Sequence, residues 1–111
     1  MTRYVDIASL EDIPAHGARL IRTTDGCVAL FRTADNRVFA LDDRCPHKGG
    51  PLSEGIVHGH QVTCPLHDWV FDLTTGAARG ADQGAVRTWP VRVERGRILI
   101  SAESLMRGKA A

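Results

Sequence analysis

Four side chains that can bind a metal are arranged as two Cys/His pairs. Cys45 and His47 form the first pair, Cys64 and His67 form the second, and sixteen residues separate the pairs. Each pair lies in a segment that carries proline. Two thiolates and two neutral imidazoles fit either a tetrahedral zinc site or a [2Fe-2S] cluster whose two irons have different ligands. The pattern therefore indicates a metal centre of one of these two kinds.

The order of the ligands bears on the choice between zinc and a cluster. Zinc fingers usually pair cysteine with cysteine and then histidine with histidine, whereas the order in this chain is Cys, His, Cys, His. Each loop then supplies one sulfur and one nitrogen, which suits two metal ions of different ligation. The order favours the cluster. A zinc-stabilised interaction module stays open as an alternative of another class.

The spacing Cys-x-His followed by Cys-x-x-His resembles the signature of the Rieske family. The resemblance implies that Cys45 and Cys64 hold one iron of a [2Fe-2S] cluster and that His47 and His67 hold the other. It also implies an all-β fold, a Rieske-type antiparallel β-sandwich with an inserted cluster-binding subdomain of two loops. The expected function is one-electron transfer.

The resemblance also bears on the redox potential. High-potential members of the family carry a loop disulfide, at positions that match Gly50 and Leu66, and hydroxyl donors, at positions that match Trp69 and Phe71. None of these four residues can supply the missing group. We therefore expect a potential near the lower end of the Rieske range, around −150 mV rather than about +300 mV.

Longer runs around the ligands narrow the resemblance. Residues 45–57, 64–76 and 88–91 are similar to the small subunit of assimilatory NAD(P)H-dependent nitrite reductase. That resemblance implies a large partner subunit with FAD, an iron-sulfur cluster and sirohaem, which reduces nitrite to ammonia. The chain would then be part of an oxidoreductase while acting by itself as an electron carrier. The alternative partner is an aromatic-ring-hydroxylating dioxygenase, whose Rieske ferredoxins share the fold, the ligand spacing and the missing disulfide.

The elements that must position the ligands are predicted to be strands. Eleven Gly, five Pro and short apolar runs without helical periodicity predict a mainly β chain. Ser9 is expected to cap one short helical turn that Pro14 ends. The predicted strands are Tyr4 to Ile7, Ala18 to Thr23, Cys27 to Thr33, Arg37 to Leu41, Trp69 to Leu73, Val86 to Glu94 and Arg97 to Ser101.

Length and composition limit the organisation. We expect a single domain over residues 1–103 with a cluster-binding subdomain at about 43–73, and a flexible tail over 104–111. With 14 Lys and Arg against 13 Asp and Glu, the net charge of +1 argues against a nucleic-acid partner. No segment reaches the roughly 18 apolar residues of a membrane span, and no signal peptide is recognisable. The expected location is therefore the cytoplasm, without a membrane partner.

The remaining polar and aromatic residues are assigned no role in the metal centre. Cys27 lies in an apolar run and is predicted to be a buried structural thiol. Phe71 and Leu73 are predicted to belong to the core. The other histidines and the carboxylates beside the two loops are expected to be solvated or turn-forming, with no catalytic role; these are His16, His58, His60, Asp42, Asp43, Asp68 and Asp72.

Overall fold

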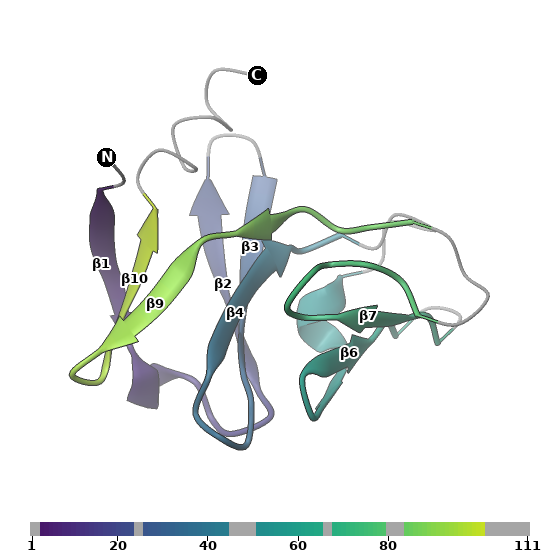
Figure 1. Cartoon of the computed structure of the whole chain (residues 1–111), viewed down its shortest axis with the longest axis horizontal. Helices are drawn as coiled ribbons and strands as arrows, with labels where there is room; N and C mark the ends of the chain where they lie inside the picture. Colours follow the sequence, from purple (N-terminus) through teal and green to yellow (C-terminus); the bar gives the residue numbers. More distant parts are fainter. Residues whose placement is uncertain (1–2, 24–25, 45–50, 66–67, 80–83, 102–111) are drawn as a thin grey trace.

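The computed structural model describes residues 3–23, 26–44, 51–65, 68–79 and 84–101 (Figure 1). Ten strands and two short 3-10 helices are found in these residues. The strands are β1 (Tyr4–Ser9), β2 (Ala18–Thr23), β3 (Gly26–Arg32), β4 (Val38–Asp42), β5 (Ile56–His58), β6 (Gln61–Thr63), β7 (Val70–Asp72), β8 (Thr88–Trp89), β9 (Val91–Glu94) and β10 (Arg97–Ser101). The 3-10 helices are η1 (Leu10–Asp12) and η2 (Leu52–Glu54). None of the described segments is a helix that could cross a membrane.

The strands form three antiparallel sheets. Their orders are β1-β10-β9, β2-β3-β4-β8 and β5-β6-β7. Figure 1 shows the first sheet on the left, the second in the middle and the third on the right. The observed sheets confirm the all-β antiparallel prediction.

The middle sheet contributes to two separate cores. Alternate residues of a strand point to opposite faces, and β3 places Val28 and Leu30 in one apolar cluster and Ala29 and Phe31 in the other. The first cluster is shared with β1 and β10, and the second with the sheet β5-β6-β7. Burial on both faces explains why β3 reads as a continuous apolar run rather than as an alternating one.

The predicted strand Val86 to Glu94 is divided in the structure. Proline has no N–H to donate to a ladder, and at Pro90 the chain leaves one sheet for another. Before it, β8 pairs with β4; after it, β9 pairs with β10. The carbonyl of Pro90 accepts a hydrogen bond of 3.1 Å from the amide of Ser101. One proline thus joins the first two sheets.

Two short strands were not predicted. β5 and β6 have three residues each, too few for a periodic pattern to be recognised, and the turn between them has Gly59 at φ 56°. The predicted helical turn after Ser9 is confirmed. The Ser9 hydroxyl accepts from the amide of Glu11, and the Asp12 carboxylate accepts from the amide of Ser9 at 3.0 Å.

The prediction that Cys27 is buried is wrong. Its side chain is exposed, because β3 is covered only from Val28 onward. Cys27 pairs with Arg22 near the end of the ladder where β2 is connected to β3, beyond both cores. Its apolar neighbours in the sequence therefore did not indicate its own environment.

Candidate metal centre

Two loops leave neighbouring parts of the fold and carry the predicted ligands. The first follows β4 and leads into η2, and the second connects β6 to β7. Cys45, His47 and His67 lie outside the described residues. Cys64 and the segments where each loop begins and ends are described.

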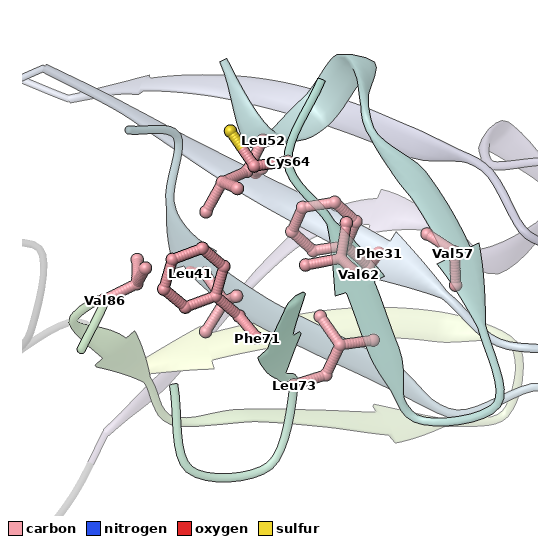
Figure 2. Close-up of a cluster of buried hydrophobic side chains, with 10 residues drawn as sticks. Phe31, Leu41, Leu52, Val57, Val62, Cys64, Phe71, Leu73 and Val86 are labelled. Atoms are coloured by element: carbon pink, nitrogen blue, oxygen red, sulfur yellow. The ribbon is translucent and has the colours of Figure 1, made fainter. Parts of the chain in front are cut away.

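Cys64 begins the second loop and is fully buried. It follows β6 directly and belongs to the apolar cluster that includes Leu52, Val62 and Phe71. In Figure 2 its sulfur lies at the edge of this cluster, next to Leu52. The amide of Cys64 donates to the carbonyl of Trp69 at 2.7 Å. This bond joins the residue after β6 to the residue before β7, and so brings the two ends of the second loop together.

The first loop is closed by a carboxylate. Asp43 accepts one hydrogen bond from the amide of Ser53 at 2.6 Å and a second from its hydroxyl at 3.0 Å. The amide of Asp43 donates to the carbonyl of Cys27 at 3.0 Å, which fixes it to β3. Beside it, Asp42 accepts from the indole N–H of Trp89 at 2.7 Å. Both ends of the first loop are thus tied to the middle sheet and to each other.

Gly55 brings the end of the first loop against the beginning of the second. A Cβ atom at this position would lie 2.2 Å from the carbonyl oxygen of Thr63 and 3.1 Å from that of Leu52. Only glycine permits such an approach. Since Thr63 directly precedes Cys64, the two loops are packed together at their bases.

The two histidines between the loops each make a hydrogen bond to another side chain. His58 Nε2 lies 2.7 Å from the hydroxyl of Thr63, and His60 Nε2 lies 3.0 Å from Asp35 Oδ2. Hydrogen bonds from the Thr33 hydroxyl and then from His60 lower the pKa of Asp35 to about 2. His60 and Asp35 therefore join the β5-β6 turn to the β3-β4 turn.

The aromatic and acidic residues of the second loop behave as predicted where they are described. Phe71 and Leu73 are buried in the core, and Trp69 packs against it with its ring 6.2 Å from that of Phe71. Asp72 is a turn former, since it accepts from the amide of Thr74 at 2.7 Å. Sequence reasoning missed the contacts of Asp43 and Gly55, because neither contact leaves a pattern in a single sequence.

The match to known proteins is extensive. Residues 3–101 match the Rieske-like [2Fe-2S] domain family. The chain belongs to this family. It is a Rieske [2Fe-2S] electron-transfer protein, and its cofactor is a [2Fe-2S] cluster. The described loop ends fit that cofactor, because a buried cysteine begins one short closed loop while a second closed loop packs against it.

Relatives of two kinds are similar to this Rieske protein over most of its length. The ferredoxin component of a naphthalene 1,2-dioxygenase/salicylate 5-hydroxylase system from Ralstonia is 30% identical, over 90% of this chain and 96% of its own. The ferredoxin subunit of a 3-phenylpropionate/cinnamic acid dioxygenase from Photorhabdus laumondii is 38% identical, over 86% and 90%. A crystal structure assigned as an NADH-dependent nitrite reductase small subunit from Mycobacterium tuberculosis is 26% identical with a TM-score of 0.80, over 91% and 96%.

Proposed function

We propose that Cys45, His47, Cys64 and His67 hold the cluster and that the chain carries single electrons between two protein partners. The observation that carries the proposal is the position of Cys64. It is a fully buried cysteine at the base of a closed loop that also contains His67. The cluster supplies a site that accepts and releases one electron, and the chain supplies its ligands and a buried base.

A ring-hydroxylating dioxygenase is the better supported partner. The curated relatives named as dioxygenase ferredoxins reach 38% identity and align over nearly the whole of both chains. We therefore propose that it delivers electrons to the oxygenase component of such a system.

The small-subunit role in an NAD(P)H-dependent nitrite reductase is the second candidate. It is supported by the similarity of residues 45–57 and 64–76 to that family and by the TM-score of 0.80 to a structure assigned to it. In this role the partner is a large subunit with FAD, an iron-sulfur cluster and sirohaem. The expected low potential suits electrons derived from NAD(P)H in either system.

The ligand assignment is tested by removing one thiol at a time. Replacing Cys45 or Cys64 by Ser should abolish the visible absorption of the cluster and the iron content of the protein. The matched variant Cys27→Ser should keep the absorption and the iron. Cys27 is the suitable control because its thiol is exposed, and its hydrogen bond to Asp43 at the base of the first loop is made by its backbone carbonyl, which serine keeps. Full colour in either ligand variant, or a colourless parent that contains zinc, would contradict the assignment.

The partner is tested by reoxidation of the reduced protein. The reduced carrier should be reoxidised rapidly by the oxygenase component of a naphthalene-type dioxygenase in the presence of its aromatic substrate. The same measurement with the large subunit of a nitrite reductase and nitrite provides the comparison. Rapid reoxidation by the nitrite reductase alone would reject the oxygenase and select the second candidate.

A further inference from the structure

The carboxylate of Asp43 lies at the base of the first ligand loop and joins the two sides of that loop. It accepts both the amide and the hydroxyl hydrogens of Ser53, at 2.6 and 3.0 Å. Hydrogen bonds to an ionised carboxylate are shorter and stronger than bonds between neutral groups. Two such bonds fix the orientation of Ser53 relative to the carboxylate of Asp43 as well as the distance between the two residues.

The connection continues from Ser53 to the second loop. Ser53 lies in η2, and the residue after this helix, Gly55, donates its amide to the carbonyl of Leu52 at 2.9 Å. Gly55 in turn packs against the carbonyl of Thr63. A continuous path of hydrogen bonds and backbone contacts therefore runs from Asp43, two residues before Cys45, to Thr63, one residue before Cys64.

No proposed ligand takes part in this path. The amide of Asp43 is held by the carbonyl of Cys27 in β3, and Leu52 is fully buried in the core. The bases of both loops can therefore be held by the protein alone. A site whose ends are fixed in advance loses less conformational entropy when it takes up its cofactor.

From this geometry we propose that Asp43 is a positioning residue for the metal centre, which holds the first loop against the second through Ser53 before the cluster is bound. The proposal rests on the assignment of Cys45 and Cys64 as ligands. It predicts that the bond between Asp43 and Ser53 is present in the cluster-free protein and that its loss speeds release of the cluster.

The test compares four variants in the full-length, cluster-loaded protein. With an iron chelator in excess, Asp43→Ala should lose its visible absorption at least tenfold faster than the parent, which corresponds to about 1.4 kcal/mol. Asp43→Asn keeps an acceptor for the Ser53 amide, so its rate of cluster loss should be within about threefold of the parent's. Ser53→Ala removes the hydroxyl but keeps the amide, so its rate of cluster loss should lie between those of Asp43→Ala and the parent. Glu54→Ala, which removes an exposed carboxylate from the adjacent position, should match the parent.

A second measurement needs no cluster and does not depend on any variant folding. In the cluster-free parent protein, the Ser53 amide should exchange with deuterium far more slowly than an unstructured peptide of the same sequence. Exchange at the unstructured rate, or a parental rate of cluster release in Asp43→Ala, would overturn the proposal. Failure of the ligand assignment is recognised separately, because Cys45→Ser or Cys64→Ser would then keep the cluster.

Discussion

Replacing Gly55 by alanine should destabilise both the fold and the metal centre. The added Cβ would lie 2.2 Å from the carbonyl oxygen of Thr63, and the two segments must separate by about 0.8 Å to reach even 3.0 Å. The backbone angles of Gly55, φ −80° and ψ −177°, are accessible to alanine. The predicted effect therefore comes from the close contact alone and not from backbone strain.

The size of the effect follows from what the Cβ meets. Overpacking typically costs about 1–3 kcal/mol, and we expect about 3 kcal/mol because the obstructing atoms are backbone and cannot rotate away. For a chain of this length that cost lowers the melting temperature by roughly 10–20 °C. Since Thr63 precedes Cys64, the loaded protein should also lose its cluster faster.

Thermal unfolding followed by circular dichroism, with the visible absorption recorded in parallel, measures both effects. Gly59→Ala is the matched control, because nothing lies within 4 Å of its added Cβ and its φ of 56° is the only penalty. That penalty is about 1 kcal/mol. A melting temperature of Gly55→Ala within about 2 °C of the parent's, or a larger loss of stability in Gly59→Ala than in Gly55→Ala, would contradict the steric origin of the effect.

Two further predictions concern single carboxylates. The folded-state pKa of Asp35, about 2, lies below its ordinary value of 3.8, so its contribution to stability is present above pH 4 and is lost as the pH falls from about 4 to 2. Asp35→Asn should flatten that part of the curve of unfolding free energy against pH; an unchanged slope would contradict the contact with Thr33 and His60. Trp89→Phe removes the indole donor to Asp42 and should cost about 1–3 kcal/mol in denaturant unfolding. A cost below about 0.5 kcal/mol would show that this bond does not hold the loop.

The sequence was most informative where a local rule decides the structure. β2 and β10 were predicted with the bounds that the structure has, and the turn at Arg95 and Gly96 has the two positive φ values of a tight hairpin. The cap at Ser9 followed from side-chain chemistry that acts over three residues. In each case the deciding interactions are close together in the chain.

Contacts between distant segments could not be predicted. The exposure of Cys27 depends on where the covering layers end, and the role of Gly55 depends on a strand eight residues further on. Asp43 looked like a turn former because its partner Ser53 lies ten residues away. The proposed ligands were recognised for a different reason, since their types and order alone carry the chemistry.

The division of β3 and β4 between two cores has a consequence for protein engineering. A chimera that transplanted only residues 43–73 into another Rieske scaffold would bring six of the ten buried residues of its supporting cluster and leave four behind. Those four, Ala29, Phe31, Leu41 and Val86, would have to travel with the insert, while Val28, Leu30 and Ala40 could stay with the recipient. The unit that can be exchanged is therefore one face of a sheet and not a continuous piece of chain.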